Sequence, residues 1–198
     1  AVGDNASTTA QHKPAMTRSP PISTTAVAAV TDLCASDLSD AIHSKKLSCR
    51  EVMQAYLQRI ADANPRVNAI VSLLDADDLL RQADERDAQL ARGQSMGWMH
   101  GMPQAIKDLA NVVGLPNTMG SPLMRNFMPK EDGLMVQRMK AAGCIVIGKT
   151  NVPEFGLGSH SFNEVFGVTR NAFDPALSAG GSSGGGAVAL AMRMLPVA

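Results

Sequence analysis

The sequence predicts an α/β fold from three observations. Residues 31–93 carry apolar side chains at helical spacing, whereas residues 102–147 alternate two short apolar runs with one helical stretch. Of the 17 glycines, 16 lie between residues 93 and 186. Because glycine permits tight turns and a close approach of the backbone to a ligand, we expect any functional site in this second half.

Composition and charge exclude several classes of protein. Apolar residues make up 45% of the 198 residues, enough to build a buried core, and charged residues make up 18%. The formal net charge of zero argues against a nucleic-acid binder or a polybasic membrane-surface protein. The three cysteines have no C-x-x-C spacing, so neither a disulfide framework nor a zinc site is indicated. No stretch approaches the ~20 apolar residues of a membrane span, so we expect a soluble, cytoplasmic protein.

Residues 1–30 are rich in Ala, Ser, Thr and Pro and show neither a helical nor an alternating apolar period. This composition predicts a disordered leader, with the folded domain beginning at residue 31. The first methionine is Met16, so we interpret residues 1–15 as added or upstream sequence.

A helix is predicted to begin at Ser48, because Ser48 and Glu51 match the S-x-x-E capping box. Its apolar face carries Val52, Met53, Tyr56, Leu57 and Ile60. Pro65 is expected to end this helix, since proline lacks a backbone N–H.

Further elements follow in order. Residues 68–73 form a short strand candidate, Asp75 can cap the next helix, and Gly93 can end it. Strands are then predicted over residues 102–106 and 144–147, separated by a helix over 134–142.

Residues 143–150 match the phosphate-loop pattern GxxxxGK[ST]. In a true phosphate loop the four variable residues form a loop after a strand, whereas here they are Cys-Ile-Val-Ile and follow a predicted helix. We therefore interpret the segment as a helix stop, a buried strand and a turn.

Residues 180–184 match the nucleophile-elbow pattern GxSxG, which requires a preceding strand and later Asp and His partners. Residues 174–179 are not typical of a strand, and no Asp, Glu or His follows Ser182. A flexible linker is one alternative for the Gly/Ser run 178–186. We favour a functional loop, because the run leads into an apolar helix predicted over 187–195, whose N-terminal N–H groups suit an anion or oxyanion.

Lys107 is the only basic residue in a short, mostly apolar strand. Taken alone, it is most simply a lysine at a strand end that reaches solvent. Asp108 is expected to point to the opposite face, because side chains alternate along a strand.

Six segments in order resemble the amidase signature family over residues 31–198. They are GMPQAIKD at 101–108, TMGS at 118–121, VIGKTN at 146–151, PEF at 153–155, FGVT at 166–169 and GGSSGG at 180–185. The resemblance implies a mixed β-sheet core flanked by helices. It also implies that the chain holds the N-terminal part of a single domain, so we expect this fold to be incomplete at its C-terminal side.

The resemblance also implies a Ser–Ser–Lys catalytic triad. Lys107 matches the family's catalytic lysine, and Ser182 matches the bridging serine, which in the family follows a cis peptide bond. Ser183 is a supporting hydrogen-bond partner, and Gly156 and Ser159 fall in the segment that lines the substrate cavity in relatives.

In this chemistry a neutral lysine acts as the base that activates a serine hydroxyl against a small-molecule amide. No metal and no organic cofactor is required. The family's nucleophilic serine follows the bridging serine, but no serine follows Ser183 here, so we expect the 198 residues alone to be inactive.

Two alternatives to a bacterial-amidase-like hydrolase stay open. One is the glutamine-hydrolysing component of a tRNA-dependent amidotransferase, which passes ammonia to a partner bound to tRNA without contacting nucleic acid directly. The other is a non-catalytic fragment or pseudoenzyme that binds an amide or a partner. The oligomeric state is also open, with a homo-oligomer among the alternatives.

Overall fold

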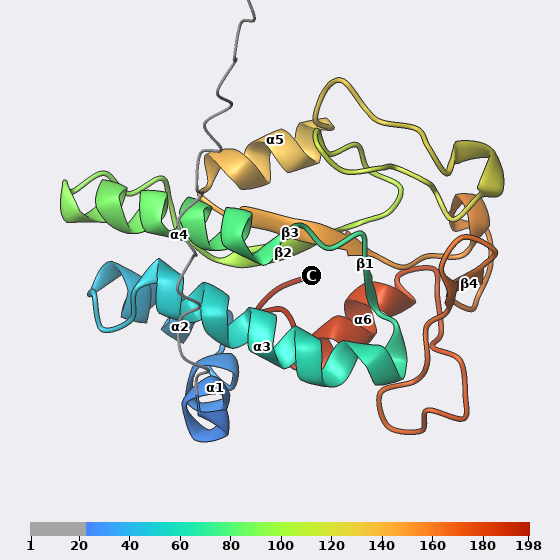
Figure 1. The fold of residues 1–198 in the computed structure, drawn as a ribbon, viewed down its shortest axis with the longest axis horizontal. Helices are drawn as coiled ribbons and strands as arrows, with labels where there is room; N and C mark the ends of the chain where they lie inside the picture. The colour runs from blue at the N-terminus through green and yellow to red at the C-terminus, as the bar shows by residue number, and fades with distance from the viewer. Residues whose placement is uncertain (1–22) are drawn as a thin grey trace, which may run out of the picture.

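The computed structural model describes residues 23–198, and its first element is a helix that the sequence did not predict (Figure 1). Helix α1 (Thr24–Thr31) begins at Ser23, whose side chain accepts a hydrogen bond from a backbone N–H of the first turn at 3.2 Å. Val27 and Val30 are buried. The leader predicted over 1–30 is therefore wrong for residues 24–30, because packing stabilises a helix too short to show a clear apolar period. The rest of that prediction lies outside the described residues.

Helix α3 (Cys49–Val67) begins as predicted. Ser48 Oγ accepts from the Glu51 N–H at 3.1 Å, and Glu51 Oε2 accepts from the Ser48 N–H at 2.8 Å, which completes the capping box. The prediction that Pro65 ends the helix is wrong, since α3 continues for two more residues. The final residue of α3 is buried in the core, so packing outweighs the hydrogen bond that proline cannot donate. The C-cap residue that follows the helix, Asn68, adopts a left-handed φ of 51°.

Helices α2 (Ala35–His43) and α4 (Ala76–Ala91) complete the helical first half. Asp75 caps α4 as predicted, because its carboxylate accepts two N–H groups of the first turn at 2.9 and 3.3 Å. Gly93 follows the last turn with a φ of +74°, a conformation that favours glycine.

The sheet has the order β1-β3-β2, with β1 (Ile70–Val71), β2 (Pro103–Lys107) and β3 (Ile145–Thr150). Strands β2 and β3 are parallel, whereas β1 and β3 are antiparallel. The expected mixed sheet is therefore confirmed. The register pairs Lys107 with Thr150, so the two longer strands end together.

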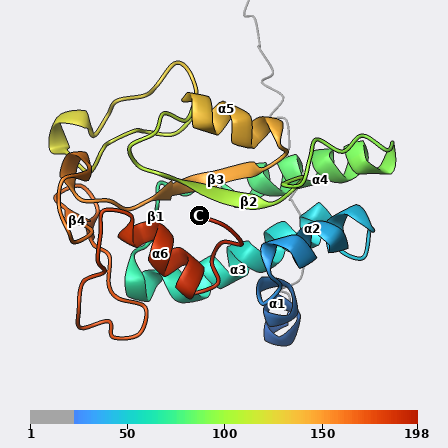
Figure 2. The ribbon, with the colours of Figure 1, turned by 180° about the vertical axis from the view of Figure 1, so that it is seen from behind.

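Helices cover both faces of this sheet (Figures 1 and 2). Helix α5 (Leu134–Ala141) packs on one face through Val136, which joins Ile106 and Val146 in a small apolar cluster. Helices α3 and α6 (Gly184–Ala191) lie on the other face, over the main core. The end of β2 and the start of α6 are thereby brought together.

The segment that matches the phosphate-loop pattern is a strand, as predicted. All six residues of β3 are buried, and Gly143 follows α5 with a φ of +103°. The strand is three residues longer than the predicted 144–147 at its C-terminal end, because β3 continues along β2 as far as Thr150.

The remaining chain forms short elements around the end of the sheet. They are the 3-10 turns η1 (Pro122–Met124) and η2 (Glu154–Gly156) and the two-stranded ribbon of β4 (Phe162–Asn163) and β5 (Gly167–Val168). Helix α6 begins three residues before the predicted 187, inside the glycine run, and it ends at residue 191.

Two kinds of feature are not found within residues 23–198. No helix there is long and apolar enough to cross a membrane. The same residues contain no group of three His, Cys, Asp or Glu side chains placed to hold a metal ion.

Candidate active site

Lys107 is the last residue of β2, and a tight turn follows it. Its carbonyl accepts hydrogen bonds from the N–H groups of Leu109 at 2.7 Å and Ala110 at 3.0 Å. The Lys107 side chain reaches the start of α6, where Nζ lies 2.9 Å from Ser182 Oγ and 2.9 Å from Ser183 Oγ. The fold therefore joins a lysine to two serines that lie 75 and 76 positions further along the sequence.

Ser182 lies in the turn that leads into α6. The peptide bond between Gly181 and Ser182 is cis, as the family resemblance implies. The Gly181 N–H donates to the Ser159 carbonyl at 2.7 Å, and the Gly184 N–H donates to Ser161 Oγ at 3.0 Å. The segment before β4 thus holds this turn on both sides of Ser182.

The first N–H groups of α6 are already occupied. Ser161 Oγ accepts from the Gly184 N–H, and the Asn151 carbonyl accepts from the Gly185 N–H at 3.2 Å. The expectation that the N–H groups of this helix end are available to an anion is therefore wrong for Gly184 and Gly185. The sequence pattern could not show this, because both acceptors come from distant segments.

Burial lowers the pKa of Lys107 from its ordinary value, because the charged ammonium is desolvated. A lower pKa leaves more of the amine neutral at a given pH. A neutral amine in contact with two hydroxyl groups can take a proton from either of them.

A buried ion pair lies beneath the turn after Lys107. Lys149 and Asp108 are both 0% exposed, and Lys149 Nζ is 3.5 Å from Asp108 Oδ1. The same ammonium donates to the Ala110 carbonyl, and Thr118 donates to Asp108 through its hydroxyl. Burial raises the pKa of Asp108 and lowers that of Lys149, although their mutual attraction acts against both shifts. Asp108 lies one residue beyond β2, so the strand alternation from which its direction was predicted does not apply to it, and its carboxylate contacts Thr118 and Lys149. Lys149 was not predicted to have any role.

A buried amide network supports the start of α6. Asn151 Nδ2 donates to Thr169 Oγ1 at 2.9 Å, and Asn151 Oδ1 accepts from Asn163 Nδ2 at 2.7 Å. The sequence analysis missed this network. The signal that could have revealed it is Asn151, a polar residue directly after a buried strand. A buried amide side chain needs hydrogen-bond partners inside the protein.

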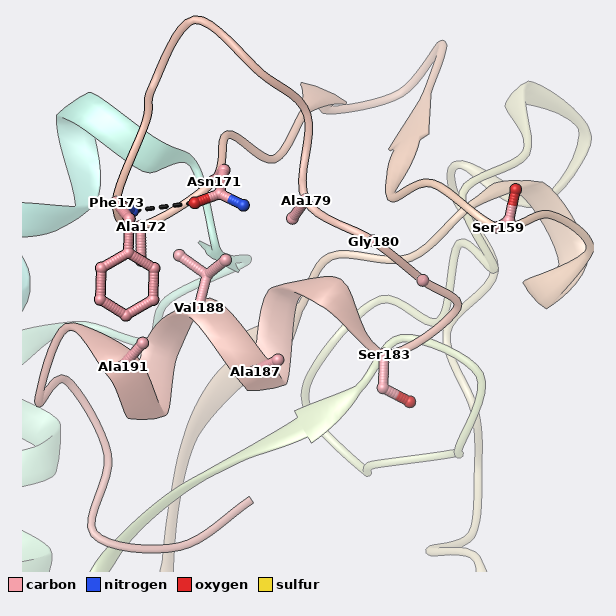
Figure 3. Close-up of a pocket in the computed structure, with 11 residues that line it drawn as sticks. Ser159, Asn171, Ala172, Phe173, Ala179, Gly180, Ser183, Ala187, Val188 and Ala191 are labelled. Atoms are coloured by element: carbon pink, nitrogen blue, oxygen red, sulfur yellow. Dashed lines mark hydrogen bonds between the residues drawn. The ribbon is translucent and has the colours of Figure 1, made fainter.

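A cavity of about 490 Å³ lies beside Ser183 (Figure 3). Ser159 and Ser183 lie toward one end of it, and Val188 and Phe173 contribute apolar walls. Ser159 lines this cavity, and its predicted place in a substrate cavity stays a prediction. Gly156 lies outside this lining, in η2, where an added Cβ would meet a side-chain carbon of the turn after β2 at 2.7 Å.

A protein-family model described as Amidase matches residues 51–198. The chain belongs to the amidase signature family. This match covers both Lys107 and the turn at residues 181–183 that leads into α6, called the serine turn below. The mixed sheet agrees with the fold of the solved structures of the family.

Curated and solved members of the amidase signature family resemble this chain over most of its length. The A subunit of glutamyl-tRNA(Gln) amidotransferase from Acidothermus cellulolyticus is 41% identical over 162 residues, covering 82% of this chain and 32% of the relative. Fatty acid amide hydrolase superimposes with a TM-score of 0.83 at 29% identity, covering 87% of this chain and 30% of that structure. Peptide amidase from Stenotrophomonas maltophilia gives a TM-score of 0.76 at 34% identity, covering 83% and 35%. The chain thus spans about a third of the length of these relatives.

Proposed function

We propose that this protein hydrolyses the C–N bond of a small carboxamide through a Ser–Ser–Lys triad and an acyl-serine intermediate. The observation that carries the proposal is the contact of Lys107 Nζ with Ser182 Oγ at 2.9 Å, at the end of a strand and the start of a helix. Family membership supports amide chemistry, and the burial that lowers the Lys107 pKa suits a general base.

In the proposed reaction Lys107 is the base and Ser182 is the proton relay. The hydroxyl oxygen of a nucleophilic serine attacks the amide carbonyl carbon, while its proton passes to Ser182 and the proton of Ser182 passes to the neutral Lys107 amine. When the C–N bond breaks, the proton returns along the same path to the leaving nitrogen. Water then cleaves the acyl-serine ester, again with Lys107 as base, and releases the carboxylic acid.

Ser183 shares the lysine contact and is proposed as a supporting partner. Among residues 23–198, the side-chain hydroxyls bonded to Lys107 Nζ are those of Ser182 and Ser183, and both are used in this scheme. Because the chain spans about a third of the length of its relatives, we propose that the nucleophile belongs to the part of the family fold that these 198 residues do not cover. We expect the 198-residue chain alone to release no ammonia from amides and to gain no acyl group by intact mass. An acyl group mapped to Ser182 or Ser183 would contradict these roles.

The test of the triad uses the natural full-length protein and the variants Lys107→Ala, Lys107→Arg and Ser182→Ala. All three should lose amide turnover by at least about a hundredfold, because general-base catalysis contributes 10²–10⁴-fold. The arginine variant should fail because guanidinium does not deprotonate in proteins. In the unmodified protein, kcat/KM should rise with pH as Lys107 loses its proton, with a midpoint below the ordinary lysine pKa because burial lowers it.

The matched control is Lys130→Ala, which removes an exposed lysine that belongs to neither β2 nor α6. It should retain full activity. Substantial turnover by Lys107→Arg would overturn the general-base role.

A second candidate is the glutamine-hydrolysing component of a tRNA-dependent amidotransferase, favoured by the names of the curated relatives. The Acidothermus cellulolyticus protein, 41% identical, and the Alkaliphilus metalliredigens protein, 35% identical, are both named as the A subunit of glutamyl-tRNA(Gln) amidotransferase. Ammonia release from glutamine, together with stable co-purification of partner proteins, would favour this candidate. Release from simple aliphatic or aryl amides by the isolated protein would favour the hydrolase.

A further inference from the structure

Ser183 is the N-cap residue of α6, but its side chain does not cap the helix. A serine at this position usually adopts an extended backbone and accepts an N–H group of the first turn. Here Ser183 has φ −99° and ψ 31°, and its hydroxyl lies 2.9 Å from Lys107 Nζ. The hydroxyl that would ordinarily cap the helix is therefore used by the catalytic cluster.

Ser161 binds the first N–H of α6 from another segment. Its Oγ accepts from the Gly184 N–H at 3.0 Å, and the residue is 0% exposed. The Ser161 backbone is itself held by two hydrogen bonds, from its N–H to the Ala179 carbonyl at 3.1 Å and from the Thr169 N–H to its carbonyl at 2.8 Å. The Ser161 hydroxyl is thus held in place by the residue after β5 and by a residue shortly before the turn at Ser182.

Gly184, the first residue of α6, leaves room for the Ser161 hydroxyl. A Cβ added at Gly184 would lie 2.4 Å from Ser161 Oγ, closer than real atoms approach. Only glycine at this position allows the Ser161 hydroxyl to reach the N–H of α6.

We propose that Ser161 is a positioning residue for amide hydrolysis. By accepting from the Gly184 N–H, directly after Ser183, its hydroxyl holds the Ser183 backbone in the conformation from which the Ser183 hydroxyl contacts Lys107. Without the Ser161 hydroxyl, the buried Gly184 N–H loses its partner, and the Ser183 backbone relaxes toward the extended conformation of an ordinary N-cap residue, which withdraws the Ser183 hydroxyl from Lys107. Lys107 then loses one of its two hydroxyl contacts. This inference rests on the function proposed above.

The test is a double-mutant cycle on kcat in the natural full-length protein, with Ser161→Ala, Ser183→Ala and the double variant. Ser161→Ala should lower kcat about tenfold and change KM less than about twofold, because the loss lies in the reacting cluster. In the Ser183→Ala background the same substitution should lower kcat less than about twofold, since the contact it protects is already absent. Where amide turnover by Ser183→Ala falls below detection, the cycle is read with an activated aryl ester.

A merely structural role predicts a different pattern. Ser161→Ala would then lower kcat by the same factor in both backgrounds, and that result would overturn the proposal. The matched control is Ser39→Ala, which removes another buried serine hydroxyl, hydrogen-bonded to the Trp98 carbonyl at 2.7 Å and outside the site. It should leave kcat unchanged.

Two further measurements keep the test decisive. Ser161→Cys retains a weaker acceptor of similar size, so its kcat should fall between that of the wild type and that of Ser161→Ala, and this variant replaces the alanine variant if the latter does not fold. An unchanged kcat in Ser161→Ala, alongside an inactive Lys107→Ala, would overturn the positioning role alone. An active Lys107→Ala would instead overturn the proposed function.

Discussion

Replacing Lys149 by methionine tests the buried ion pair beside the turn after Lys107. The substitution shortens the side chain by one heavy atom and leaves the Asp108 carboxylate, 0% exposed, without its cation. Removing one partner of a buried pair typically costs about 3–5 kcal/mol, because the remaining charge is uncompensated. For a chain of this size that loss lowers Tm by about 6–20 °C. The Ala110 carbonyl also loses its Lys149 donor, which adds to the loss.

The assay is thermal and denaturant unfolding of Lys149→Met beside a surface control. Lys140→Met removes an ion pair of 2.7 Å in which the lysine is 35% and Asp132 17% exposed, so it should cost less than about 1 kcal/mol. The double variant Lys149→Met/Asp108→Asn should recover more than half of the lost stability, because no buried charge is left unpaired. Equal losses for Lys149→Met and Lys140→Met would refute this reasoning.

Two more predictions concern close packing and burial. Gly185→Ala should destabilise the protein by about 3 kcal/mol, because its Cβ would lie 2.4 Å from the backbone nitrogen of the residue after β3. Gly186→Ala should be neutral or mildly stabilising in the same melting experiment, since its nearest contact is an ordinary 3.5 Å. Iodoacetamide at about pH 8 should add one group, at the exposed Cys34, because burial raises the pKa of Cys49 to about 12 and that of Cys144 to about 11. Labelling of either buried thiol in the native protein, read by peptide mass, would contradict the burial.

Local sequence patterns determined the elements whose signals lie within a few residues. The capping box at Ser48 and Glu51 and the Asp75 cap were predicted correctly, because each is a contact between near neighbours along the chain. The same holds for the strand predicted at 144–147, where a continuous apolar run excluded a phosphate loop, although its extension to Thr150 was not predicted. Pro65 was predicted wrongly because tertiary packing overrode a local preference.

For the candidate site, the sequence supplied the residue types and the order of the motifs. Lys107 and Ser182 were predicted from the family resemblance, and the structure brings their side chains to 2.9 Å. Composition and spacing alone left Lys107 as a lysine that reaches solvent.

Tertiary structure alone decided how the serine turn is held. The acceptors of the first N–H groups of α6 are Ser161 and Asn151, which lie 23 and 34 positions before their donors. The partner of Lys149 is likewise Asp108, on the neighbouring strand end. Apolar periodicity reports which face of an element is buried, but a hydrogen bond between distant segments depends on strand register and on the close approach of two backbones. Those contacts exist only once β2, β3 and α6 have packed together.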